Sequence, residues 1–235
     1  MRIDIWSDVR CPFCYIGKHK FEKALEKFPH KEEVNVVWYS FQLDPNIKTN
    51  PEMSDAEYLA KAKGLSKAQV NQMLKGAEEM GKEMGLNFNF DQTKVANSLN
   101  AHRLIQLAKA KNLANETEEA LFKSHFEEGK NIDDKMTLKE IGKSVGLKEE
   151  DLDRMLFTDE YKEQVEDDQL HAGEIGVRGV PFFVFDKKYA VSGAQPEEAF
   201  LEVLHKTWEE YKGKENPTII VNEGKSCDTS GNCDD

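Results

Sequence analysis

The stretch RIDIWSDVRCPFCYIGKH, residues 2–19, places Cys11 and Cys14 between a predicted strand and a predicted helix. Apolar and polar side chains alternate before the cysteines, which is typical of a short strand. Pro12 suits the first position of a helix, where its missing N–H leaves no hydrogen bond unmade. The unpaired N–H groups and the positive dipole end of that helix favour a thiolate over a thiol. The pair is therefore suited to electron and disulfide exchange rather than to holding a fold together.

The rest of the chain follows an α/β order. Residues 34–43 are rich in β-branched and aromatic side chains and predict a buried strand. Residues 53–172 contain no proline and consist mostly of helix formers, so five or six helices are expected there. Strands return at 181–185 and 189–192 as a hairpin, and Pro196 opens another helix. The predicted order is strand–helix–strand, a helical insertion, and then hairpin–helix.

The composition indicates a globular protein with a highly charged surface. Of the 235 residues, 39% are hydrophobic and 32% are charged, and the formal net charge is −12. Nucleic acid and anionic membrane surfaces attract basic patches, so neither is an expected partner. No stretch reaches the roughly 18 apolar residues of a membrane span, and residues 1–6 resemble a strand rather than a signal peptide. A cytoplasmic location is expected, where a CxxC pair is more often catalytic or metal-binding than structural.

Three interpretations compete for Cys11 and Cys14. In the first, Cys11 is the attacking thiolate at the helix start, and Cys14 is the more buried thiol that resolves the mixed disulfide. In the second, the two thiols are half of a zinc site, and in the third they are buried thiols without a function. The CxxC spacing alone is moderately specific. Its strand–loop–helix setting, with proline at the first helical position, favours redox chemistry.

A second candidate feature is Gly179-Val180-Pro181, directly before the predicted hairpin. An isolated proline that opens a strand most often lies at a sheet edge. The alternative is a cis Val180–Pro181 bond, with the Val180 backbone facing the disulfide site and pairing with an extended substrate peptide. Only about 5–6% of X–Pro bonds are cis. The residues alone leave both possibilities open.

Several polar residues have weaker assignments. Asp8 is a candidate proton relay during exchange, although an aspartate at such a position more often caps a loop or a helix end. Asn97, His102 and Arg103 are predicted to lie on a helix of the insertion and are candidates to line the groove that faces the cysteines, although packing and surface roles are favoured. His19 follows the first cysteine by about two helical turns and is expected at the surface.

The chain resembles the FrnE-like branch of the DsbA family over about residues 1–212. The motifs that carry the resemblance are DVRCPFCYIGK (8–18), FQLDP (41–45), NS (97–98) with AHRL (101–104), GVRGVPFF (176–183) and SGAQP (192–196). The resemblance implies a thioredoxin-like domain made of residues 1–48 and 173–212. It further implies an all-helical insertion domain at 49–172 and a C-terminal tail at 213–235.

The same resemblance implies site residues. Cys11 and Cys14 are the catalytic pair, and a cis Pro181 lies opposite them. Val180, Pro181 and Phe13 form the surface that binds substrate. The DsbA type has Pro-His between its cysteines, whereas this chain has Pro-Phe. Because Phe13 donates neither a hydrogen bond nor a positive charge to a thiolate, we expect a less strongly oxidising couple than that of periplasmic DsbA.

Two further functions are considered. Glutathione-dependent enzymes of the 2-hydroxychromene-2-carboxylate isomerase and kappa-class transferase types have similar folds but carry serine at the position of Cys11, so the presence of both cysteines weighs against them. The other alternative is a zinc-binding adaptor that recruits partners through the insertion.

The expected partners are protein substrates with thiols or disulfides, and small thiols. No cofactor is expected beyond the redox-active disulfide, and glutathione is a candidate reductant. The sequence is compatible with a monomer and with a homodimer.

A second cysteine pair, Cys227 and Cys233, lies near the C-terminus. The six-residue spacing allows a disulfide to close easily. A redox relay with the first pair, a structural disulfide and a zinc site are the three interpretations. A relay or an accessory disulfide is favoured, because a zinc site that used all the cysteines would need the tail to fold back over the active site.

Overall fold

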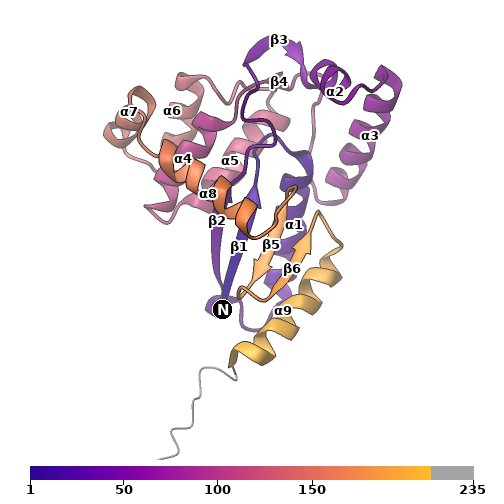
Figure 1. Cartoon of the computed structure of the whole chain (residues 1–235), viewed down its shortest axis with the longest axis vertical. Helices are drawn as coiled ribbons and strands as arrows, with labels where there is room; N and C mark the ends of the chain where they lie inside the picture. Colours follow the sequence, from indigo (N-terminus) through magenta and orange to yellow (C-terminus); the bar gives the residue numbers. More distant parts are fainter. Residues whose placement is uncertain (213–235) are drawn as a thin grey trace, which may run out of the picture.

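The structure is a computed structural model that describes residues 1–212. Its centre is a four-stranded sheet in the order β2-β1-β5-β6 (Figure 1). Strand β1 pairs in parallel with β2 and antiparallel with β5, and β5 forms an antiparallel hairpin with β6. The strands are β1 (Arg2–Ser7), β2 (Asn35–Ser40), β5 (Phe182–Phe185) and β6 (Tyr189–Ser192). The sequence therefore predicted these strands in the correct order.

Strand β2 ends earlier than the expected residue 43. The backbone N–H of Gln42 donates to Gln169 Oε1 at 2.8 Å, and Gln169 Nε2 donates to the Gln42 carbonyl at 3.1 Å. A side-chain amide on another element thus takes the hydrogen bonds that a neighbouring strand would make. This long-range contact is invisible in the local sequence pattern.

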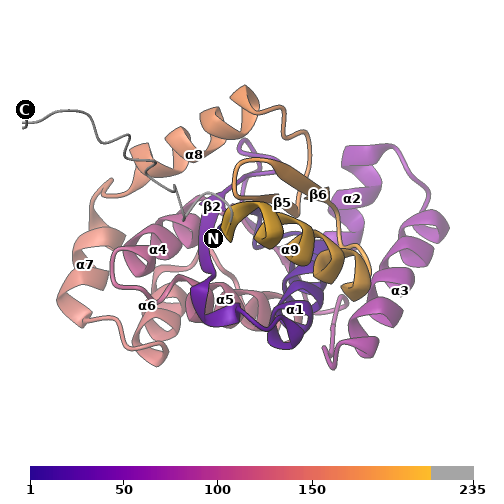
Figure 2. The ribbon, with the colours of Figure 1, turned by 90° about the horizontal axis from the view of Figure 1, so that it is seen from below.

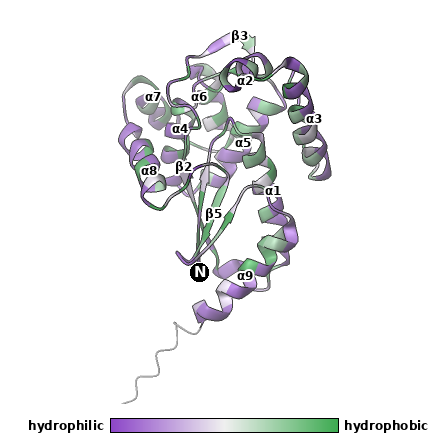
Figure 3. Cartoon of the chain, turned by 45° about the vertical axis from the view of Figure 1, so that its right-hand side comes forward, coloured by the Kyte–Doolittle hydropathy of each residue, from purple (hydrophilic) through white to green (hydrophobic). Residues whose placement is uncertain are grey.

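Helices cover both faces of the sheet (Figure 2). Helices α1 (Pro12–Lys27) and α9 (Glu197–Lys212) pack together on one face, and their core includes Phe21, Phe183 and Phe200. Helix α8 (Lys162–Glu174) lies on the opposite face, where Trp6 packs with Ala172 and Val177. This arrangement is a thioredoxin-like fold. Figure 3 shows the apolar character of β5, as expected for a strand between two helical layers.

The insertion lies between β2 and α8. Its helices are α2 (Asp55–Lys63), α3 (Lys67–Glu83), α4 (Leu99–Lys109), α5 (Ala114–Phe126), α6 (Lys135–Ser144) and α7 (Glu149–Phe157). It is not all-helical, because β3 (Asn50–Ser54) and β4 (Lys94–Val95) form a small antiparallel sheet. Strands this short carry too few residues for an alternating pattern, and they pair across some forty intervening residues. A local pattern therefore cannot predict them.

The insertion packs directly on α1. The rings of Tyr15 in α1 and Phe122 in α5 stack with centroids 4.9 Å apart, and both residues belong to one continuous hydrophobic core. The insertion is thereby held against the start of α1. None of the helices in residues 1–212 is long and apolar enough to cross a membrane.

The expected division into residues 1–48 with 173–212, 49–172 and 213–235 stays a prediction. Helix α8 begins within the segment assigned to the insertion and ends at Glu174, on the sheet. The tail at 213–235, with Cys227 and Cys233, lies outside the described residues.

Candidate active site

The two cysteines lie where the loop after β1 enters α1. Cys11 is the N-cap residue with extended backbone, and Pro12 is the first helical residue. Among the described residues, Cys11 and Cys14 are both free thiols. Cys11 is 6% exposed and Cys14 is 1% exposed. Cys11 is thus the more accessible sulfur, in the order expected for an attacking and a resolving thiol.

The environment separates the acidities of the two thiols. A hydrogen bond with the Cys14 thiol lowers the pKa of Cys11; burial opposes this, and the backbone N–H groups of Cys14 and Phe13 add to it. Burial raises the pKa of Cys14 well above its usual value, and the neighbouring Cys11 sulfur raises it further. The site therefore favours the thiolate form of Cys11 and the thiol form of Cys14.

The start of β5 brings a proline opposite the cysteines. The Val180–Pro181 bond is cis, as the resemblance implies, and Cys11 Sγ lies 3.7 Å from the Val180 carbonyl oxygen. Gly17 of α1 makes this approach possible, because a Cβ atom there would lie 2.9 Å from Pro181 Cγ. Helix α1 and the strand can therefore pack closely enough to bring Val180 to the thiol.

A cavity of about 150 Å³ opens beside Cys11. Phe13 lines it from α1, and Leu59 and Met73 line it from α2 and α3 of the insertion. These side chains are only partly buried. Lys63 adds an exposed positive charge at the lining. The cavity thus offers an apolar surface directly next to the accessible thiol.

Asp8 is fully buried under this site. Its carboxylate accepts hydrogen bonds from the backbone N–H groups of Leu43 at 2.8 Å and Arg10 at 3.2 Å. His102 Nε2 lies 3.4 Å from Asp8 Oδ1. Burial alone would raise the pKa of Asp8, but the neighbouring His102 and the Leu43 N–H outweigh it and lower the pKa. Asp8 holds the loop in place and also faces a histidine that the sequence did not connect to it.

The three polar residues expected on one helix have different roles. Asn97 precedes α4, and its side-chain oxygen accepts a hydrogen bond from the Leu99 N–H at 2.8 Å. Arg103 is buried and donates to backbone carbonyls, including that of Glu160 at 2.8 Å. Both residues are structural. His102, expected to have a packing or surface role, is fully buried at the site, and a lone histidine in a helical pattern gives no signal of such a partner.

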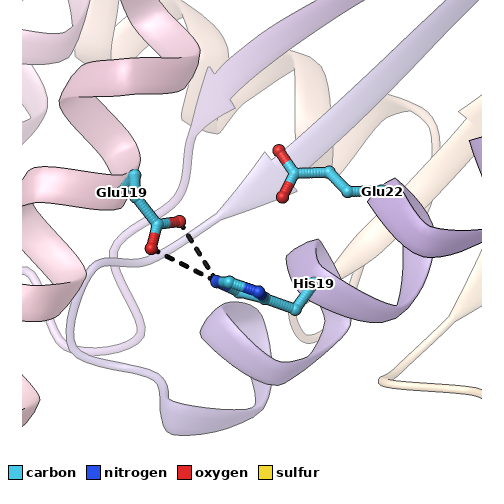
Figure 4. A group of neighbouring side chains, drawn as sticks. All are labelled: His19, Glu22 and Glu119. Atoms are coloured by element: carbon cyan, nitrogen blue, oxygen red, sulfur yellow. Dashed lines mark hydrogen bonds and ion pairs between the residues drawn. The ribbon is translucent and has the colours of Figure 1, made fainter. Parts of the chain in front are cut away.

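His19, which was expected at the surface, is partly exposed and has a partner on α5. It is 24% exposed in its side chain, and its Nε2 lies 3.2 Å from Glu119 of α5 (Figure 4). Burial opposes the charge on Glu119, but hydrogen bonds from His19 and Lys18 lower its pKa to about 2. Within residues 1–212, His19, Glu22 and Glu119 are the group that could hold a metal ion. Lys18 Nζ already lies 2.9 Å from Glu22 of the same helix and 2.7 Å from Glu119, and the contact with Glu119 joins α1 to α5.

The sheet order, the thiols at the start of α1 and the cis bond at residues 180–181 place the chain among thioredoxin-like proteins. Within that class it belongs to the family of DSBA-like thioredoxin domains, whose model matches residues 2–205. It is 32% identical to a probable DsbA oxidoreductase from Streptomyces coelicolor, with a TM-score of 0.84 over 100% of this chain and 98% of that one. It is also 27% identical to the uncharacterized protein YwbO of Bacillus subtilis. That alignment spans 206 residues and covers 87% of this chain and 96% of YwbO.

More distant structures share the fold. A 2-hydroxychromene-2-carboxylate isomerase is 15% identical with a TM-score of 0.65, over 92% of this chain and 100% of that one. The cytosolic disulfide reductase DsbM from Pseudomonas aeruginosa, solved with GSH, is 14% identical with a TM-score of 0.61, over 92% of this chain and 99% of that one. At these identities the comparison concerns the fold alone.

Proposed function

We propose that the protein is a thiol–disulfide oxidoreductase or isomerase that acts on protein substrates through Cys11 and Cys14. The observation that carries this proposal is the pairing of a more accessible thiol of lowered pKa with a buried thiol of raised pKa. Attack requires a thiolate, and resolution requires a second thiol within reach. A serine at either position would remove one of these two steps.

The proposed reaction has two displacements. The Cys11 thiolate attacks a substrate disulfide, so a Cys11–substrate disulfide forms and the other substrate sulfur leaves as a thiolate. Cys14 then loses its proton and attacks Cys11 Sγ, which releases the substrate thiolate and forms the Cys11–Cys14 disulfide. When the protein forms a disulfide in a substrate, the same two displacements occur in the reverse order. We propose glutathione or another small thiol as the reductant that restores the dithiol.

Substrate binding is assigned to the surface around Cys11. The Val180 backbone, adjacent to Cys11 Sγ, would pair with an extended peptide, while Pro181 and Phe13 would contact its side chains. An apolar residue next to the substrate cysteine would enter the cavity lined by Leu59 and Met73. These features fit unfolded polypeptides, which expose apolar side chains.

We further propose that the protein is of the FrnE-like subtype and is located in the cytoplasm.

The experiment that tests this proposal compares insulin reduction and the reactivation of scrambled ribonuclease with glutathione conjugation and isomerisation. The wild-type protein should act on the protein disulfides, and Cys11→Ser should abolish this activity. Activity only in the glutathione assays would contradict the proposal and favour a glutathione-dependent transferase or isomerase. Metal analysis of the reduced protein provides a second control, since stoichiometric zinc would favour an adaptor that binds metal through its thiols.

A further inference from the structure

Arg10, the residue before Cys11, places a buried positive charge in the wall of the cavity beside the accessible thiol. Its side chain is 8% exposed, and a buried charge is costly unless it is paired and hydrogen-bonded. The guanidinium has one carboxylate partner, with Nη2 at 3.4 Å from Asp55 Oδ1. Within residues 1–212 its buried Nε has no hydrogen-bond partner. The cation is therefore incompletely satisfied, because its one ion pair is long and a donor is unused.

The guanidinium is nevertheless held in one place. It lies over the ring of Tyr58, 5.0 Å from the ring centroid, and the Tyr58 hydroxyl donates to Asp44 at 2.6 Å. Asp55 is the first residue of α2, and its other oxygen lies 3.5 Å from Nε2 of the buried His125. A side chain that is fixed in advance loses little freedom when a ligand binds, so Arg10 is preorganised to bind an acceptor.

The cavity has a local charge opposite to that of the whole chain. Its charged lining residues are Arg10, Lys63 and Asp55, which sum to a net positive charge, whereas the formal net charge of the chain is −12. The remaining lining is mostly apolar and includes Leu59 and Met73. A volume of about 150 Å³ admits one group of the size of a ring or a side chain. The cavity therefore suits a group with an apolar stem and an anionic end.

We propose that Arg10 binds a carboxylate beside the reacting disulfide, so that the protein selects substrates with an acidic group next to the cysteine. The methylene groups of that acidic side chain contact Leu59 and Met73, and its carboxylate accepts hydrogen bonds from Arg10. This inference rests on the proposed dithiol function and adds a charge preference to it. Two sources supply such a carboxylate, namely an acidic residue of a protein substrate and a small thiol such as glutathione.

A structural role of Arg10 predicts a different result. An arginine that only joins the Cys11 loop to α2 through Asp55 would affect the reaction with every substrate alike. An arginine that binds a carboxylate affects only the substrates that carry one. The net charge of −12 by itself disfavours acidic substrates, so a preference for them requires a local positive site. The informative quantity is therefore the ratio of two rates and not the activity itself.

The test compares peptides that differ by one charge. Each peptide has a single cysteine joined by a disulfide to a chromophoric aromatic thiol, with glutamate or glutamine directly before or directly after that cysteine. The Cys11 thiolate attacks the peptide sulfur, a Cys11–peptide disulfide forms, and the aromatic thiolate that leaves is followed by stopped-flow absorbance. Each rate is divided by the rate with a neutral free thiol. The wild-type protein should prefer the glutamate peptide on the order of tenfold in one of the two positions, as expected for a hydrogen bond to a charged group.

A second pair of substrates distinguishes the source of the carboxylate. Glutathione disulfide is compared with its ethyl ester, which lacks the negative charges. A preference for the glutamate peptides that depends on Arg10 assigns the site to acidic residues of protein substrates. A preference for glutathione disulfide alone, again dependent on Arg10, assigns it to the carboxylate of a small thiol.

Three variants connect the preference to Arg10. Arg10→Gln removes the cation, so the ratio of the two rates should fall to near one. Arg10→Lys keeps the charge without the planar fork and should retain part of the preference. Arg154→Gln is the matched control, because it makes the same change at an exposed arginine of α7 that does not line the cavity, and it should keep the wild-type ratio. Equal ratios in Arg10→Gln and the wild-type protein would overturn the inference.

Two measurements remain if Arg10→Gln does not fold. Lys63 is exposed, and Lys63→Gln should lower the wild-type preference by about two- to threefold, the effect of a solvent-exposed charge. The wild-type preference should also decrease as salt is added. A wild-type ratio near one for every pair of substrates overturns the inference and leaves the proposed function intact. If the wild-type protein reacts with none of these disulfides, the proposed function itself fails.

Discussion

Replacing Glu118 of α5 by glutamine should make the protein more stable at neutral pH, even though the residue is buried. The unfolded chain releases the Glu118 proton near the ordinary pKa of 4.5, whereas the folded protein holds it to about 7. Between these values the folded state binds more protons, so the free energy of unfolding falls as pH rises. Below pH 4.5 both states are protonated and the penalty is absent; above pH 7 it is complete.

The size of the penalty follows from the two pKa values. Their difference of about 2.5 units, at about 1.36 kcal/mol per unit, corresponds to about 3 kcal/mol. Glutamine has a similar shape and stays neutral at every pH. We therefore expect Glu118→Gln to match the wild-type protein at pH 4 and to exceed its stability by up to about 3 kcal/mol above pH 7.

Urea unfolding at a series of pH values measures this difference. Glu116→Gln is the control, because it makes the same chemical change on an exposed residue of α5 and should leave the pH dependence of unfolding as in the wild-type protein. The reasoning is refuted if the stability difference between Glu118→Gln and the wild-type protein is the same at pH 4 and pH 8. A loss of stability in Glu118→Gln at pH 8 would show that the carboxylate is stabilised in the folded state.

Three further predictions concern the dithiol and its surroundings. Cys14→Ser should accumulate mixed disulfides through Cys11, detectable by non-reducing electrophoresis and mass spectrometry; their absence would contradict the assigned roles. The reduction potential against glutathione should lie below that of periplasmic DsbA, and Phe13→His should raise it, because an imidazole stabilises the Cys11 thiolate; an unchanged potential would exclude this role of Phe13. Gly17→Ala should lower the free energy of unfolding, because a Cβ would lie 2.9 Å from Pro181 Cγ and crowding of about 1–3 kcal/mol exceeds the gain in helix propensity of up to about 1 kcal/mol. If Gly17→Ala is as stable in urea as the wild-type protein, or more stable, then Pro181 moves aside to make room for the added methyl group.

Much of the fold could be predicted because its signals are local. The strand before Cys11, Pro12 at the helix start, the hairpin at 182–192 and the helix after Pro196 each follow from residues that are neighbours in the chain. Helix-forming composition without proline likewise identifies the insertion. The pairing of β3 with β4 was missed, because it depends on contacts between segments that are far apart in the sequence.

The sequence by itself determined the chemistry available to this protein: two thiols at a helix start, a proline before a hairpin, and a phenylalanine between the cysteines. Only the tertiary structure decided which polar groups share the site. Asp8 and Cys14 are close in the chain, but His102 comes from a helix of the insertion and lies 3.4 Å from Asp8 only in the folded protein. The physical reason is that burial and charge depend on what surrounds a side chain in space. A glutamate in a helical pattern is ordinarily a surface residue, and only packing removes Glu118 from water.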